Sequence, residues 1–391
     1  MKLIYPCLLA AMIVSTHAVG AQPALKDAFQ TKFLIGAAVN ESQFTGRNAA
    51  QSALVKNQFN TITPENDLKW ERVHPAPGHF NFEAADHYVA FGETNQMFIV
   101  GHNLIWHNQT PAWVFQDATG QPLGRDALLA RMREHILTVA GRYQGRIHGW
   151  DVVNEAVAED GSLRATPWLK IIGEDYLLKA YQFAHEADPA AELYYNDYDL
   201  ENPAKRAGAI ALVKKLQAQG VKISGVGIQG HYHLNRPTAE KVDATITDIA
   251  KLGVKVMITE LDVDVLPSAR DSLSAEVTQK FQGEARLNPF AQGLPDEMQA
   301  KLAARYAELF AVFLQHRDVV KRVTFWGVTD GDSWLNGWPV AGRTSYPLLF
   351  DRAGKPKPAF TSVVSLAQKS ARATSGMMDD SAVHADVLPT K

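Results

Sequence analysis

The sequence contains almost no cysteine. Cys7 is the only one in 391 residues, and it lies in an apolar N-terminal run that we expect to be cleaved from the mature chain. The mature protein would then have no disulfide, no cysteine nucleophile and no thiolate metal site. A chain of this length can bury a core large enough to be stable without disulfides.

The sequence also has no marked excess of charge of either sign. It contains 39 Lys and Arg residues against 42 Asp and Glu residues, which gives a formal net charge of −3. A basic surface for a polyanion is therefore not indicated, and we expect no nucleic-acid partner. A neutral polymer or a small molecule is the more suitable ligand.

The apolar run at the N-terminus is too short to span a membrane. Lys2 precedes it, residues 3–14 form it, and small residues follow, with Val19-Gly20-Ala21 as a suitable cleavage site. This pattern predicts a secretory signal peptide over residues 1–21, with an N-terminal membrane anchor as the alternative. We therefore expect a secreted or periplasmic protein that has no membrane association after cleavage.

No Pro-, Ser- or Gly-rich linker divides the rest of the chain, and no internal repeat stands out. We interpret residues 22–370 as a single domain and residues 371–391, where the hydrophobic periodicity is lost, as a disordered tail. Residues 266–293 form a long connection between a predicted strand and a predicted helix. This stretch is expected either to form part of a cleft wall or lid, or to be a surface loop without a function.

Apolar runs alternate with amphipathic stretches along the domain. Eight runs are predicted strands and the stretches between them are predicted helices, which favours the α/β class and a closed parallel (β/α)8 TIM barrel over an open sheet. The predicted strands are residues 33–39, 59–63, 97–101, 147–153, 192–195, 225–229, 254–259 and 323–328. The clearest helical patterns are residues 128–143, 176–187, 204–219, 239–252 and 298–316.

Two of the predicted strands end in a glutamate. Asn154 and Glu155 follow residues 147–153, and Glu260 follows residues 254–259. A strand of apolar residues has no structural reason to end in such side chains, and a barrel brings distant strand ends to one mouth. Glycoside hydrolysis needs two carboxyl groups that flank one bond, because one protonates the leaving oxygen while the other acts at the anomeric carbon. Taken singly, each glutamate could equally cap a helix or pair with an arginine.

Most of the other strand ends carry polar or aromatic residues. Sugars need this mixture, because their hydroxyls require donors and acceptors and the apolar face of a pyranose stacks on an aromatic ring. Any one of these residues alone is as readily structural, and Glu65 and Lys69 have the spacing of a helical ion pair. The residues are Glu65, Asn66 and Lys69 at the end of the second strand, His102, Trp106 and Gln109 at the end of the third, Asn196 at the end of the fifth, Gln229 and His231 at the end of the sixth, and Trp326 and Trp334 at the end of the eighth.

Two motif matches point elsewhere and are set aside. Residues 225–230 fit a dinucleotide-binding fingerprint, but His231-Tyr232-His233 follows them instead of a helix, so no nucleotide cofactor is expected. The paired histidines resemble a metal motif, but the further histidines that a barrel metal site needs are missing from the first strand. We therefore expect neither a cofactor nor a catalytic metal.

These segments resemble the family 10 glycoside hydrolases, the endo-1,4-β-xylanases. The similarity lies in residues 63–66, 101–107, 150–156 and 258–262, and it extends in order over about residues 33–360. Asn103 departs from the family pattern, which often has Thr there, and the stretch 266–293 looks long. The second departure concerns the shape of the cleft and not the chemistry.

The resemblance implies retaining hydrolysis of xylan and a role for each matched residue. Glu155 would be the acid/base and Glu260 the nucleophile. The supporting residues would be Asn154, which would bind the sugar 2-hydroxyl, and His231 with Asp262, which would orient Glu260. The residues lining the sugar subsites would be Glu65, Asn66, Lys69, His102, Trp106, Gln109, Asn196, Gln229, Trp326 and Trp334.

Three alternatives stay open at this point. The first is a barrel that binds a glycan without cleaving it, but such a protein has no need for two unpaired acids. A β-1,4-glucanase or cellulase is closer, because glucose adds only a hydroxymethyl group and its exclusion depends on the shape of the cleft. A metal-dependent barrel hydrolase is the least favoured. The expected partner is xylan or a xylo-oligosaccharide, and the protein is expected to be a monomer.

Overall fold

The computed structural model describes residues 22–268, 281 and 284–382. In this part of the chain eight parallel strands form a closed barrel, in the order β6-β5-β4-β3-β2-β1-β9-β8, and β6 pairs with β8 to close it. The predicted (β/α)8 barrel is therefore confirmed. The strands are β1 (Leu34–Val39), β2 (Thr61–Pro64), β3 (Phe98–Ile105), β4 (Gly149–Asn154), β5 (Glu192–Asp197), β6 (Gly225–Ile228), β7 (His231–His233), β8 (Lys255–Asp264) and β9 (Val320–Phe325).

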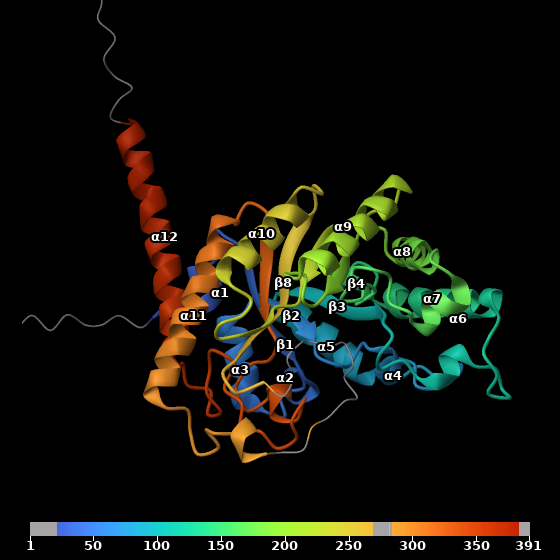
Figure 1. Ribbon diagram of the computed structural model, residues 1–391, viewed down its shortest axis with the longest axis horizontal. Coiled ribbons are helices and arrows are strands. Elements are labelled where there is room, and N and C mark those ends of the chain that lie inside the picture. The colour runs from blue at the N-terminus through green and yellow to red at the C-terminus, as the bar shows by residue number, and fades with distance from the viewer. Residues whose placement is uncertain (1–21, 269–280, 282–283, 383–391) are drawn as a thin grey trace, which may run out of the picture.

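Helices alternate with the strands and surround the barrel (Figure 1). The helices are α1 (Leu25–Ala28), α2 (Glu41–Phe44), α3 (Ala49–Gln58), α4 (Trp70–Val73), α5 (Glu83–Thr94), α6 (Arg125–Arg142), α7 (Pro167–Ile172), α8 (Tyr176–Ala187), α9 (Pro203–Ala218), α10 (Ala239–Ala250), α11 (Asp296–Gln315) and α12 (Pro358–Ala382). Short 3-10 helices span Ala112–Phe115 (η1), Ala285–Leu287 (η2) and Trp334–Asn336 (η3). The five predicted helices correspond to α6, α8, α9, α10 and α11.

The core lies inside the barrel and between the barrel and its helices, and every residue of β4 is buried. Trp150 packs against the neighbouring strand at Gly101, where an added Cβ atom would lie 2.1 Å from the indole ring. Glycine is thus required at position 101 for close packing. The buried strands fix the direction in which the residues at their carboxyl ends project.

The last barrel strand and the sixth strand end differently from the predictions. β9 stops at Phe325, before the predicted end at 328, and Gly327 then turns the chain with a φ of 129°, its N–H donating to the Phe325 carbonyl (2.9 Å). After β6, His231–His233 form β7, a separate short strand that pairs with β8. Trp326 and His231 are thereby directed toward the mouth of the barrel.

The two ends of the chain were predicted to lie outside the domain. Residues 1–21, the predicted signal peptide, lie outside the described residues. A disordered tail was predicted from residue 371, but the backbone stays helical to Ala382, and residues 371–382 contain no proline that would interrupt the helix. The helix α12 projects beyond the barrel (Figure 1), and residues 383–391 lie outside the described part.

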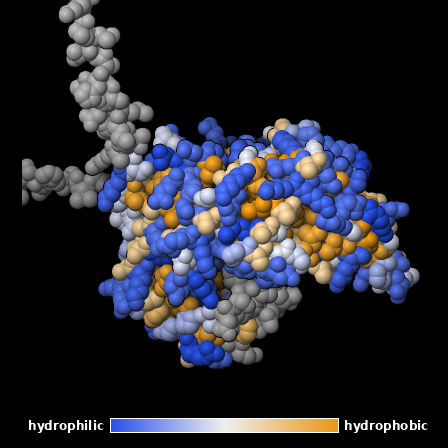
Figure 2. Space-filling model, turned by 45° about the horizontal axis from the view of Figure 1, so that its top comes forward, coloured by the Kyte–Doolittle hydropathy of each residue, from blue (hydrophilic) through white to orange (hydrophobic). Residues whose placement is uncertain are grey.

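Hydrophilic side chains cover most of the face shown in Figure 2, where apolar residues form several separate groups. No helix in the described part of the chain combines the length and the apolar character needed to cross a membrane.

Candidate active site

Glu155 follows the last residue of β4, and its carboxylate is almost fully buried. Trp106 Nε1 donates to one carboxylate oxygen (2.8 Å), and Gln229 Nε2 donates to the other (2.9 Å). Burial raises the pKa of Glu155 above the ordinary value, the charge of Glu260 raises it further, and the two donors oppose the increase. Glu155 is therefore biased toward the protonated form, which can act as an acid.

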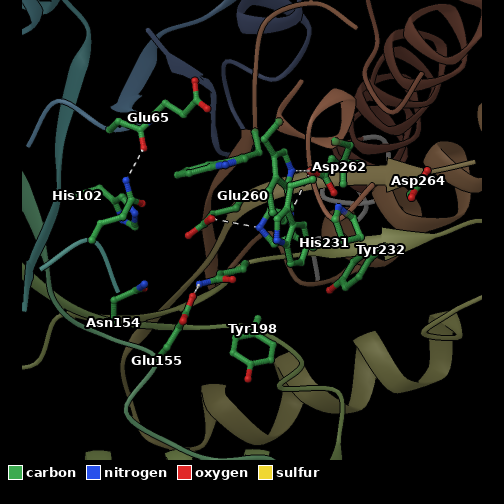
Figure 3. A pocket seen from close by; sticks show the side chains of 18 of the residues that line it. Glu65, His102, Asn154, Glu155, Tyr198, His231, Tyr232, Glu260, Asp262 and Asp264 are labelled. Carbon is green, nitrogen blue, oxygen red and sulfur yellow. Dashed lines mark hydrogen bonds and ion pairs between the residues drawn. The ribbon is translucent and has the colours of Figure 1, made fainter. Parts of the chain in front are cut away.

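Glu260 lies in β8 and has the opposite bias. Asn196 Nδ2 donates to its Oε1 (2.8 Å), and His231 Nε2 lies 3.2 Å from its Oε2. Burial alone would raise the pKa of Glu260, but the hydrogen bond from His231 and the charges of His102 and His231 outweigh it, so the pKa is lowered. Glu260 is therefore held as a carboxylate. Figure 3 shows it between Asn154 and Glu155 on one side and His231 on the other.

His231 is held as a cation by two carboxylates. Its Nδ1 lies 3.1 Å from Asp262 Oδ2, and its Nε2 faces Glu260. Burial alone would lower the pKa of His231, but the charge of Asp262 and the contacts with both acids raise it to about 10. Trp334 Nε1 donates to the same oxygen of Asp262 (2.8 Å). The pairing of β7 with β8 sets this geometry, because His231 and Asp262 occupy matching positions.

These residues line one cleft of about 350 Å³ at the carboxyl ends of the strands. The predicted site residues that line it are Glu65, Asn66, Lys69, His102, Trp106, Gln109, Asn154, Glu155, Gln229, His231, Glu260, Asp262, Trp326 and Trp334. The structure therefore brings together side chains from strand ends that are far apart in the sequence.

Asn196 is the predicted subsite residue that the structure places elsewhere. It is fully buried and does not line the cleft, because all its side-chain polar atoms are engaged beneath it. Its Nδ2 donates to Asn154 Oδ1 (2.9 Å) as well as to Glu260, and its Oδ1 accepts a hydrogen bond from Thr259 (2.6 Å). Asn196 therefore positions Asn154 and Glu260 and does not itself face a ligand.

One wall of the cleft carries a buried cation. Lys69 Nζ donates to Gln109 Oε1 (2.8 Å) and to Asn66 Oδ1 (3.0 Å), and it lies 5.1 Å from the centre of the Trp106 ring. Burial lowers the pKa of Lys69, and the surrounding acids, Glu260 foremost, oppose the change. This wall offers amide and ammonium donors to the hydroxyls of a polar ligand.

Further cleft residues were not predicted. They are Tyr198, Tyr232, His233, Asp264, Ser268, Leu335, Trp338, Pro339 and Arg343. Trp338 could have been predicted, because it follows closely after the predicted site residue Trp334 in the sequence. In the structure the two rings stack with their centres 4.6 Å apart. No local pattern marks Arg343, whose ion pair with Asp264 joins residues far apart in the sequence. Ser268 shows that the start of the stretch 266–293 contributes to the cleft wall.

The arrangement suits acid and base chemistry on a carbohydrate. Two carboxyl groups with opposite protonation biases share one cleft, and amides, an ammonium group and tryptophan rings surround them. Among the described residues, no cluster of three or more histidine and acidic side chains has the geometry to hold a metal ion.

Comparison with known proteins gives a consistent result. The model of glycosyl hydrolase family 10 matches residues 24–366. Endo-1,4-β-xylanase A of Xylanibacter ruminicola is 43% identical over 345 residues, which cover 88% of this chain and 94% of that protein. An endo-1,4-β-xylanase of Geobacillus stearothermophilus is 43% identical over 352 residues, which cover 88% and 98% of the two chains.

Solved structures agree with the sequence relatives. A family 10 endoxylanase from a sugarcane soil metagenome is 47% identical and superposes with a TM-score of 0.86, over 88% of this chain and 100% of that one. A variant enzyme solved with xylotriose is 36% identical with a TM-score of 0.77, over 87% and 99% of the two chains. The chain therefore belongs to glycosyl hydrolase family 10.

Proposed function

We propose that this protein is an endo-1,4-β-xylanase that cleaves internal β-1,4-xylosidic bonds of xylan with retention of configuration. The observation that carries the proposal is the opposite bias of two carboxyl groups in one cleft. The pKa of Glu155 is raised and that of Glu260 is lowered, which favours an acid at the first residue and an ionised nucleophile at the second. The names of the matched relatives support xylan as the substrate.

The first step forms a covalent intermediate. The Glu260 carboxylate attacks the anomeric carbon, the glycosidic C–O bond breaks, and the Glu155 carboxyl gives its proton to the departing oxygen. The ester formed on Glu260 is neutral, and the negative charge now lies on Glu155, which has lost its proton. Asn196 and His231 hold the nucleophile during the attack through their contacts with the two carboxylate oxygens.

The second step releases the sugar. The glycosyl ester no longer carries the negative charge of Glu260, so the pKa of Glu155 falls and its carboxylate can accept a proton from water. That water attacks the anomeric carbon from the side opposite the ester, and Glu260 leaves as a carboxylate. Gln229 and Trp106 stabilise the Glu155 anion in this step, because both donate to it.

Release of reducing ends from xylan and from carboxymethyl-cellulose in parallel tests the proposal. The mature protein should release sugar strongly from xylan, and the Glu260→Ala variant should release none. Release mainly from carboxymethyl-cellulose would retain the chemistry and replace the substrate by a β-1,4-glucan. No release from either polymer would favour a barrel that binds glycans without cleaving them.

We also propose that the protein acts outside the cytoplasm as a monomer. The charged and apolar pattern of residues 1–21 supports export. The mass of the protein recovered from cell-free medium and periplasm tests cleavage after Ala21, and light scattering tests the monomer. An uncleaved protein confined to cells, or a dimer at assay concentration, would contradict these two points.

A further inference from the structure

Two loops meet behind the acid/base glutamate. Residues 155–166 follow β4, and residues 198–202 follow β5. Tyr198 belongs to the second loop and lines the cleft, and its hydroxyl group is bonded to Glu159 and Arg164 of the first. The position of a cleft residue is thus tied to the loop that carries Glu155.

Arg164 makes the central contacts of this junction. Its Nε donates to the main-chain carbonyl of Glu155 (3.1 Å), and its Nη2 donates to the carbonyl of Val157 (2.9 Å) and to the hydroxyl of Tyr198 (2.7 Å). Its own N–H donates to the carbonyl of Ala156 (2.8 Å). The planar guanidinium group therefore fixes the direction of the chain just after the catalytic residue.

The backbone of Glu155 needs such support. Its φ is 57°, in the left-handed region that a residue with a side chain rarely adopts. Such a conformation persists only where the surroundings hold it. The Glu155 N–H donates to the carbonyl of Asn196 (2.9 Å), and Arg164 binds the carbonyl on the other side of the residue. The two contacts together aim the carboxyl group at Trp106 and Gln229.

Tyr198 is itself a fixed anchor. Lys205 is fully buried, lies 3.1 Å from the centre of the Tyr198 ring and pairs with Asp197 at 2.9 Å. The Tyr198 N–H donates to the same carboxylate (2.9 Å). Arg164 therefore joins the acid/base loop to a side chain that is held from below by a buried ion pair.

We propose that Arg164 is a positioning residue for general acid catalysis: it holds the backbone of Glu155 in its left-handed conformation and locks it to Tyr198. The proposal rests on the function proposed above, with Glu155 as the acid. It gives Arg164 a role in protonation of the leaving group and none in the attack by Glu260.

The test compares two substrates of the Arg164→Met variant. A phenyl β-xylobioside needs protonation of its leaving group, whereas a 2,4-dinitrophenyl β-xylobioside does not. Misplacing the acid should lower kcat/KM on the phenyl substrate about 10- to 100-fold. The same value on the dinitrophenyl substrate should stay within about threefold, because attack by the nucleophile is unchanged. Arg164→Lys, which keeps the charge but cannot reach all three acceptors, should show the same pattern more weakly and serves if the Met variant does not fold.

Arg206→Met is the matched control. The Arg206 side chain is about as buried as that of Arg164, and it donates to the carbonyls of Leu200 and Glu201, but it does not contact Glu155. It should lower thermal stability without changing the ratio of the two substrates. Equal losses on both substrates with Arg164→Met, while the wild-type protein cleaves both, would overturn the role of Arg164 alone. A wild-type protein that cleaves neither would overturn the proposed function as well.

Discussion

His231 Nε2 lies 3.2 Å from Glu260 Oε2, and the histidine is a cation because Asp262 faces its other nitrogen. The pKa of His231 is raised to about 10, so the imidazole is charged at neutral pH. A permanent cation beside a buried glutamate explains why the nucleophile can be ionised where burial alone would protonate it.

Replacing His231 by Asn should therefore move the acid limb of the pH profile of kcat/KM to higher pH. The cation and hydrogen-bond donor that lower the pKa of Glu260 are lost, so this pKa rises and a higher pH is needed to ionise the nucleophile. Loss of a hydrogen bond to a charged group should also lower kcat/KM by about 10- to 100-fold at the optimum. His316→Asn, which removes a surface partner of Asp243, should leave the profile unchanged. An acid limb that does not move would show that His231 does not control the pKa of Glu260.

The Gln229→Met variant tests the other carboxyl group. Gln229 donates to Glu155 and opposes the increase of its pKa, so removing the donor should raise this pKa and shift the basic limb to higher pH. The first step should slow more than the second, because a carboxyl group with a higher pKa is a weaker acid and its carboxylate is a stronger base. The measurement is kcat/KM against pH, with pre-steady-state kinetics to follow the intermediate. Gln217→Met on the surface of α9 is the control, and a basic limb shifted to lower pH would contradict the assignment.

Loss of one partner from the ion pair of Arg343 with Asp264 should strongly lower the free energy of unfolding. Both side chains are nearly fully buried, and the pair joins the end of β8 to the loop that carries Trp334 and Trp338. Arg343→Met leaves a buried carboxylate uncompensated and should lower the free energy of unfolding by about 3–5 kcal/mol.

Urea unfolding measures this change, and Arg146→Met is its control. Arg146 and Glu93 form an exposed pair, which should contribute at most about 1 kcal/mol. Asp264→Asn combined with Arg343→Met should recover part of the loss, because no charge is then left unpaired. Equal effects at the buried and the exposed pair would refute this account.

The barrel was predictable because apolar runs alternate regularly with amphipathic stretches along the chain. β4 illustrates this, since its apolar run ends at Asn154 and Glu155 and its neighbours repeat the pattern. The predicted end of β9 was wrong because the chain turns at Gly327, which has a φ of 129°, and the apolar run of the sequence continues past this turn.

Glu155 and Glu260 could be selected as candidates from the sequence because each comes at the end of an apolar run. The depth of a side chain was not predictable. Asn196 is of a residue type that can bind a sugar in a subsite, but its amide group is hydrogen-bonded to Asn154, Thr259 and Glu260 below the cleft. Contacts such as that of Arg343 with Asp264 depend on how two long loops meet, which only the folded chain determines.

The anomeric configuration of glycosyl azides formed by two variants tests the central claim most directly. With Glu155→Ala and an activated aryl xyloside, azide should attack the glycosyl-enzyme formed on Glu260 and give the β-azide. With Glu260→Ala, azide should replace the nucleophile and give the α-azide, with activity partly restored in both variants. Nuclear magnetic resonance of the products distinguishes the two. The reverse assignment of anomers, or no azide product from either variant, would contradict the roles of Glu155 and Glu260.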